Sequence, residues 1–162
     1  MSEAVKHYGE AEVIDRALSL MDGNNEGEEF LLFVGGEHAQ GILDGAPVLY
    51  WPELWGLRAL LYVWHDRATP AVASALRNEA WRVREMAARV IAAREISAAT
   101  ELTALLSDRT PRVRIAAARA LGTVGRLDTV EDIRPLLKDP QVEVRRAAQQ
   151  SIDALRARSP RS

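Results

Sequence analysis

The sequence predicts an all-α fold, a short α-solenoid of about three to four stacked helical hairpins with a helical cap at its N-terminal end. A similar phrase of nine residues occurs three times, at residues 82–90, 112–120 and 143–151. The copies begin 30 and 31 residues apart, a spacing typical of stacked helical repeats. Each copy contains adjacent alanines, whose small side chains allow neighbouring helices to approach closely.

The first 50 residues do not contain the repeated phrase, and we expect them to form the cap. Residues 1–9 are predicted to be a loose leader. The spacing of apolar residues predicts helices over residues 10–21, 28–34 and 37–43. Between them, the loop 22–27 and the pair Gly35-Gly36 contain the Gly and Asn residues that end helices.

The remaining elements are predicted from apolar periodicity and from prolines. An apolar helix is expected over 51–64, with His65 as its C-terminal cap, followed by a helix that Thr69 caps and that ends near Leu76. Further helices are expected over 81–94, 96–106, 111–124, 128–137 and 141–156, the first two of these forming one hairpin. Pro135 should kink or break the helix that contains it, and residues 158–162 should fray.

An aspartate or asparagine precedes each copy of the phrase, six residues before an arginine. Its side-chain oxygen can accept hydrogen bonds from the first N–H groups of the following helix. The arginine can reach a carbonyl of the turn or the aspartate of a neighbouring unit. We therefore predict a structural ladder, and no catalytic role, for three pairs: Asn78 with Arg84, Asp108 with Arg114, and Asp139 with Arg145.

The pattern Asp-x-x-Pro-x-Val-Arg followed by an alanine-rich helix resembles the HEAT repeat, in particular the short HEAT-like class also found in bilin lyases. The resemblance covers residues 81–155 well and 51–78 more weakly. It implies one solenoid domain over 1–162, divided into an acidic cap (1–50), a degenerate unit (51–80) and HEAT-like repeats (81–157). It also implies that the second helix of each unit lines a concave binding surface, because HEAT arrays mostly bind macromolecules and rarely catalyse.

Composition narrows the functional classes further. The formal net charge is −2, but residues 1–55 carry −9 and residues 56–162 carry +7. This asymmetry allows the acidic head of one molecule to bind the basic body of another. There is no cysteine, no signal peptide at the start and no apolar run long enough to span a bilayer, so we expect a cytoplasmic protein without disulfides.

No residue pattern indicates a catalytic, cofactor or metal site, and we expect a protein that is not an enzyme. HEAT-like deoxyhypusine hydroxylases carry iron on His-Glu dipeptides, which do not occur here. The three histidines, His7, His38 and His65, share no ligand spacing. The loop that begins at Asp22 imitates a calcium-binding loop, but Phe33 occupies the position of the bidentate glutamate.

The chain concentrates aromatic residues between Tyr50 and Trp81. These residues fit either the core or a binding surface, because much of the set lies at core spacing. We predict a non-enzymatic protein-binding adaptor or scaffold. The alternative is nucleic-acid binding, since HEAT-like alkylpurine DNA glycosylases use aromatic residues on a basic face. The candidate partner-binding residues are Trp51, Trp55, Arg77, Trp81, Arg82 and Arg112.

Overall fold

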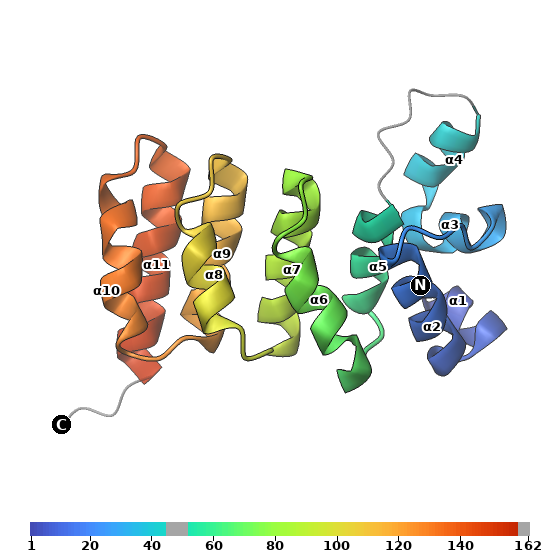
Figure 1. Ribbon diagram of the computed structural model, residues 1–162, viewed down its shortest axis with the longest axis horizontal. Coiled ribbons are helices and arrows are strands. Elements are labelled where there is room, and N and C mark those ends of the chain that lie inside the picture. Colours follow the sequence, from blue (N-terminus) through green and yellow to red (C-terminus); the bar gives the residue numbers. More distant parts are fainter. Residues whose placement is uncertain (45–51, 159–162) are drawn as a thin grey trace. The chain divides into compact units, whose positions relative to one another are not determined.

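The computed structural model describes residues 1–44 and 52–158, which form helices without any strand (Figure 1). The all-α class is therefore confirmed. The chain divides into two compact units, Met1–Val72 (unit 1) and Ala73–Ser162 (unit 2). The border falls inside helix α6 (Thr69–Ala75) and not after residue 50 or residue 80. A single domain over the whole chain stays a prediction.

Unit 1 begins with α1 (Ser2–Tyr8), where the sequence predicts a loose leader. That prediction is wrong because the segment has an apolar face that packs. Ala4 is fully buried, and the Tyr8 ring meets the rings of Phe30 and Phe33 edge-on, with 6.0 Å between centroids in each pair. The next three helices agree with the predicted ones to within a residue: α2 (Glu10–Met21), α3 (Glu28–Gly35) and α4 (Glu37–Leu43).

Helix α5 (Pro52–Leu60) is shorter than predicted. Its last turn tightens because the N–H of Tyr62 donates to the carbonyl of Ala59. His65 does not cap this helix, since its backbone is extended (φ −147°, ψ 143°). It is instead the N-cap of the 3₁₀ turn η1 (Asp66–Ala68) and accepts a hydrogen bond from the N–H of Arg67. Helix α6 follows directly, so Thr69 is its first residue and not its cap.

Helices α2 and α5 form the main packing contact of unit 1. They approach so closely that a Cβ added to Gly56 would lie 2.4 Å from the carbonyl oxygen of Ala17. A second close approach brings Gly35 of α3 against the indole of Trp55, where an added Cβ would lie 1.5 Å from a ring carbon. Glycine at these two positions allows the helices to pack at this distance.

Unit 2 contains the three copies of the repeated phrase. They form α7 (Trp81–Arg94), α9 (Pro111–Val124) and α11 (Val142–Arg158), and the first two have the predicted bounds. Helix α9 packs between α7 and α11, and these three helices stand in a row (Figure 1). Their facing residues are small or aliphatic and buried, among them Ala88, Ala118 and Leu121.

The helices between these copies are short. Helix α8 (Ala99–Leu105) packs against α9 and not, as predicted, against α7. The reason is the short turn 106–110, which returns the chain directly onto the next copy of the phrase. The second helices of the hairpins are therefore α9 and α11. The HEAT resemblance assigns the binding surface to the second helix of each hairpin, so this surface is expected on α9 and α11 and not on α8.

Pro135 interrupts its helix, as predicted. Helix α10 (Thr129–Ile133) ends two residues before it, and the chain continues as the 3₁₀ helix η2 (Arg134–Lys138). The predicted fraying does not begin at Arg158, because its guanidinium donates to the carbonyl oxygens of Gly122 and Thr123 at the end of α9. Residues 159–162 lie outside the described part of the chain.

Candidate functional site

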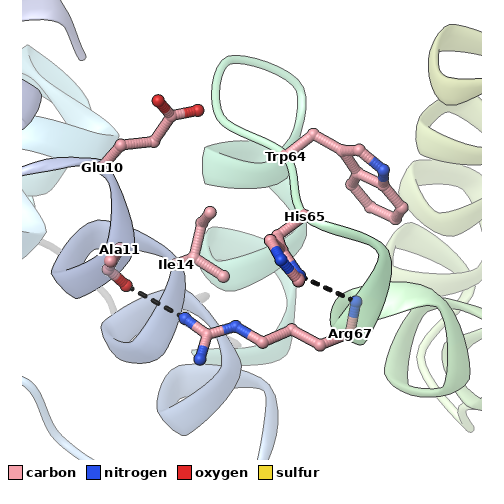
Figure 2. A pocket seen from close by; sticks show the side chains of 6 residues that line it. All are labelled: Glu10, Ala11, Ile14, Trp64, His65 and Arg67. Carbon is pink, nitrogen blue, oxygen red and sulfur yellow. Dashed lines mark hydrogen bonds between the residues drawn. The ribbon is translucent and has the colours of Figure 1, made fainter.

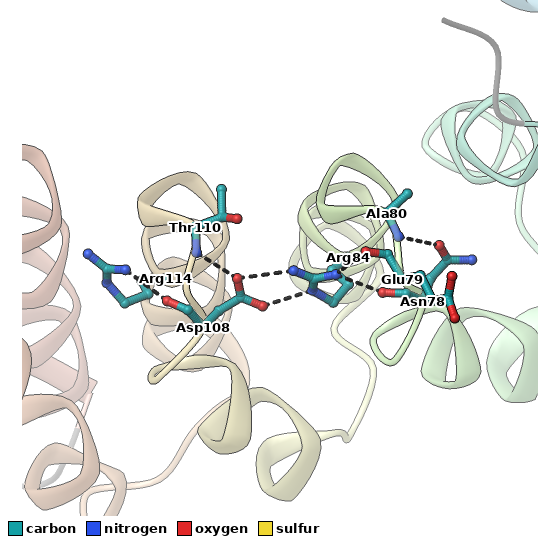
Figure 3. A network of polar contacts seen from close by, with 7 residues as sticks. All are labelled: Asn78, Glu79, Ala80, Arg84, Asp108, Thr110 and Arg114. Atoms are coloured by element: carbon teal, nitrogen blue, oxygen red, sulfur yellow. Dashed lines mark hydrogen bonds and ion pairs between the residues drawn. The ribbon is translucent and has the colours of Figure 1, made fainter.

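Arg84 joins two consecutive turns of unit 2 (Figure 3). Its Nη1 donates to the main-chain oxygens of Asn78 and Glu79, both at 2.8 Å. Its Nε and Nη2 donate to the two carboxylate oxygens of Asp108 at 2.8 and 3.1 Å. Only 11% of the Arg84 side chain and 7% of the Asp108 side chain are exposed. A bidentate, largely buried ion pair thus connects the turn before α7 to the turn before α9.

Arg114 has the same contacts one copy later. Its Nη1 donates to the main-chain oxygen of Asp108 at 2.8 Å, and its Nε and Nη2 donate to the carboxylate of Asp139 at 2.8 and 3.0 Å. Arg145, in the third copy, donates through Nη1 to the main-chain oxygens of Asp139 at 2.7 Å and Pro140 at 3.1 Å. The first two arginines therefore contact both a turn carbonyl and the aspartate of the next copy.

The two aspartates of this network are held in the ionised form. Burial alone would raise the pKa of Asp108, but hydrogen bonds from Arg84 and from the N–H of Thr110, with the charge of Arg84, outweigh it. The pKa of Asp139 is also lowered, because Arg114 and the N–H of Gln141 outweigh the effect of burial there. Both carboxylates are therefore anions at neutral pH whose oxygens already accept hydrogen bonds.

Trp51 and Trp55 are two of the six candidate partner-binding residues. Trp51 lies outside the described residues. Trp55 is only 5% exposed and packs on Gly35, and its ring is stacked near His38 with 6.0 Å between centroids. The expectation that Trp55 contributes to a binding surface is corrected, because the close approach of α3 places it in the core.

The other four candidates, Arg77, Trp81, Arg82 and Arg112, all lie in unit 2. The guanidinium carbon of Arg82 lies 4.9 Å from the Trp81 ring centroid, and that of Arg112 lies 5.6 Å from it. One arginine comes from the same helix as Trp81 and the other from the start of α9. Trp81 is half-buried and Arg77 is exposed. We call Trp81, Arg82 and Arg112 the Trp–Arg cluster.

Glu85 fixes the position of Arg112, a role that the sequence did not reveal. The Arg112 Nε lies 3.2 Å from the Glu85 carboxylate, whose side chain is 17% exposed, while 68% of the Arg112 side chain is exposed. No local signal indicates the observed pair, since the two residues are 27 positions apart.

Further arginines on α7, on α9 and just after α9 are exposed. Arg89 and Arg119 occupy the same position in successive copies, and both are exposed. Arg126, just after α9, is exposed as well. The half-buried Glu85 already accepts from Arg112, so it does not neutralise these more distant arginines. These exposed arginines attract anionic groups.

Unit 1 contains a hollow of about 520 Å³ lined by Glu10, Ala11, Ile14, Trp64, His65 and Arg67 (Figure 2). Arg67 donates to the carbonyl of Ala11 at 3.2 Å and forms an ion pair with Asp15 at 2.7 Å. His65 accepts the N–H of Arg67 through Nδ1, and Trp64 donates to Asp66 at 3.1 Å. The two Arg67 contacts hold the chain after α5 against α2. The other two hydrogen bonds are local to residues 64–67.

Nowhere within residues 1–44 and 52–158 do three or more His, Asp or Glu side chains come together in a way that could hold a metal ion. Among the same residues, no helix combines the length and apolar character needed to cross a membrane.

The row of α7, α9 and α11, with shorter helices packed against it and the same phrase in each copy, defines a helical repeat protein of the α-solenoid class. The family model for HEAT repeats matches residues 99–162. The two C-terminal hairpins, α8 with α9 and α10 with α11, are therefore HEAT repeats. No curated protein matches the sequence.

Proposed function

We propose that this protein is a non-enzymatic adaptor or scaffold that binds an acidic segment of another protein at the Trp–Arg cluster. HEAT repeats generally mediate protein interactions. The observation that carries the proposal is the position of two guanidinium groups, from consecutive copies of the repeat, against one half-buried indole ring. We further propose a cytoplasmic location, which the absence of cysteine allows.

The cluster has the composition of an interaction hot spot. Tryptophan and arginine are the residues most enriched at such positions, because they combine a large apolar area with directed polar groups. A guanidinium that stacks on an aromatic ring presents its N–H groups at the edge of its plane, and such an edge can bind a carboxylate. The ion pair with Glu85 restricts the motion of Arg112, which lowers the entropy lost on binding.

Capture from native cell lysate with immobilised full-length protein tests the proposal. We expect Trp81→Ala and Arg112→Glu each to reduce the amount of captured partner by about tenfold or more, as for hot-spot residues. Quantitative mass spectrometry of the captured proteins gives the measurement. Arg146→Glu is the matched control, because Arg146 is an exposed arginine on α11 that pairs with Glu143 of the same helix. A partner retained by both cluster variants would contradict the proposal.

Nucleic-acid binding is the second candidate, supported by the exposed Arg89 and Arg119 on the two helices that contain the cluster. Titration with short single- and double-stranded DNA at several salt concentrations separates the two functions. Phosphate contacts would give an affinity that falls steeply with salt. A protein-binding adaptor is expected to show only weak DNA binding that does not distinguish wild type from Trp81→Ala.

The acidic partner could also be supplied by a second copy of the chain, since residues 1–55 carry a net charge of −9. Such self-association would depend on charge and would weaken as salt screens it. Light scattering at low and at high salt measures the mass in solution. A monomer at both concentrations would rule out the second copy and leave a different acidic protein as the partner.

A further inference from the structure

Arg145 occupies the same position in the third copy of the phrase as Arg84 and Arg114 do in the first two. One edge of its guanidinium lacks the contact that those two arginines make. Its Nη1 donates to two turn carbonyls, as the Nη1 of Arg84 does. In Arg84 and Arg114, the opposite edge, formed by Nε and Nη2, holds an aspartate of the following copy. Within residues 1–44 and 52–158, nothing accepts a hydrogen bond from that edge of Arg145.

The contacts of Arg84 and Arg114 show which ligand the Nε–Nη2 edge binds. In both, a carboxylate accepts from Nε and Nη2 at 2.8 to 3.1 Å. The aspartate also closes its own turn by accepting a main-chain N–H, from Thr110 in one copy and Gln141 in the other. We propose that the Nε–Nη2 edge of Arg145 binds an aspartate side chain of a partner protein, presented in a turn of this kind, at the C-terminal end of the repeat stack.

The partner segment is not a further closely stacked repeat helix. The position four residues after the arginine is Ala88 in the first copy and Ala118 in the second, and both are fully buried against the neighbouring helix. In the third copy it is Gln149, which is exposed and donates to Asp153 at 2.9 Å. These two polar side chains would have to lose water and their mutual contact if a helix packed there as closely as α9 packs on α7.

A second copy of this chain does not supply the aspartate through its own repeat turns. In the first occurrence of the repeated phrase, the residue equivalent to Asp108 and Asp139 is Asn78, a neutral amide that cannot form the charged pair. Asp108 and Asp139 are already occupied by Arg84 and Arg114. The occupant we infer is therefore a turn from another protein. Val142, which is 45% exposed at the start of α11, provides apolar surface beside it.

Arginine side-chain NMR on the full-length, ¹⁵N-labelled protein tests this inference. The probe is the acetylated and amidated pentapeptide Ser-Asp-Arg-Thr-Pro, which copies residues 107–111 and has one carboxylate. We expect millimolar peptide to shift the Nε–H resonance of Arg145 saturably and by several times more than that of Arg146. The peptide with Asn in place of Asp should leave both resonances unchanged, because it lacks the charge-assisted bidentate contact.

Two variants complete the experiment. Arg145→Lys keeps the charge but not the planar edge, so it should abolish the saturable response, whereas Arg146→Lys should not alter it. Equal shifts at Arg145 and Arg146, equal effects of the two peptides, or no shift at Arg145 would each overturn the inference. If Arg145→Lys fails to fold, the two peptides on the wild-type protein still decide. The result is independent of the Trp–Arg cluster, which lies at the start of α7 and α9.

Discussion

Replacing Asp108 by alanine is expected to lower the free energy of unfolding of unit 2 by about 2–3 kcal/mol. The change removes the bidentate partner of Arg84 and leaves a guanidinium, only 11% exposed, without its counter-charge. It also removes the acceptor of the Thr110 N–H at the turn before α9. The expected loss lies below the roughly 3–5 kcal/mol of a fully buried pair, because water still reaches part of this one.

Urea unfolding followed by circular dichroism measures this loss, and hydrogen exchange of α9 amides assigns it to unit 2. Glu131→Ala is the matched control, since Glu131 pairs with Arg134 through two hydrogen bonds but on the surface. We expect the control to be nearly neutral. Equal effects of the two substitutions would show that burial of the Arg84–Asp108 pair does not matter.

The lowered pKa values of Asp108 and Asp139 provide an independent check of the same pairs. A carboxyl whose pKa is lower in the folded state contributes stability above its unfolded pKa, and this contribution is lost as the pH falls through the folded pKa. Wild-type stability should therefore decline as the pH falls below about 4. Asp108→Asn should show a shallower decline over this range, because one of the two groups no longer titrates.

Replacing Gly56 by alanine is expected to lower the free energy of unfolding of unit 1 by about 2 kcal/mol. The new Cβ would lie 2.4 Å from the carbonyl oxygen of Ala17 and 2.7 Å from the Cγ of Met21. A side chain such as Met21 can move, but the Ala17 carbonyl belongs to the backbone of α2, so the two helices must separate. The higher helix propensity of alanine recovers at most about 1 kcal/mol.

Gly41→Ala tests the same substitution without the clash. Gly41 lies in α4, and no atom lies within 4 Å of an added Cβ. Helix propensity should then make this variant equal to wild type or more stable by up to about 1 kcal/mol. Urea unfolding of both variants gives the comparison. If Gly56→Ala were as stable as Gly41→Ala, the close packing of α2 on α5 would be wrong.

The sequence predicted helices most accurately where local signals are strong. The bounds of α2, α7 and α9 agree with the predicted ones because apolar periodicity and, in α9, a proline at the first position mark them locally. No such local signal marks α1, which is helical because Tyr8 packs on two phenylalanines of α3. The helix predicted over 51–64 also extends four residues beyond the end of α5, because an apolar run does not show where a turn tightens.

The candidate site was only partly predictable. Trp55 and Trp81 have the same side chain and both lie in helices, yet one is in the core and the other forms part of a surface cluster. The difference comes from Gly35, which is 20 positions before Trp55 and leaves room for its indole. Likewise, nothing in the sequence around Glu85 indicates that it holds Arg112.

By itself, the sequence determined the repeat, its spacing and the residue types at each repeated position, because all of these are properties of the chain read along its length. Only the tertiary structure decided that α8 pairs with α9, that Trp55 is buried and that two arginines meet Trp81. The physical reason is that such contacts depend on the distance and offset between stacked helices. Side chains from several copies of the repeat together determine this distance and offset, so no single stretch of sequence specifies the contacts.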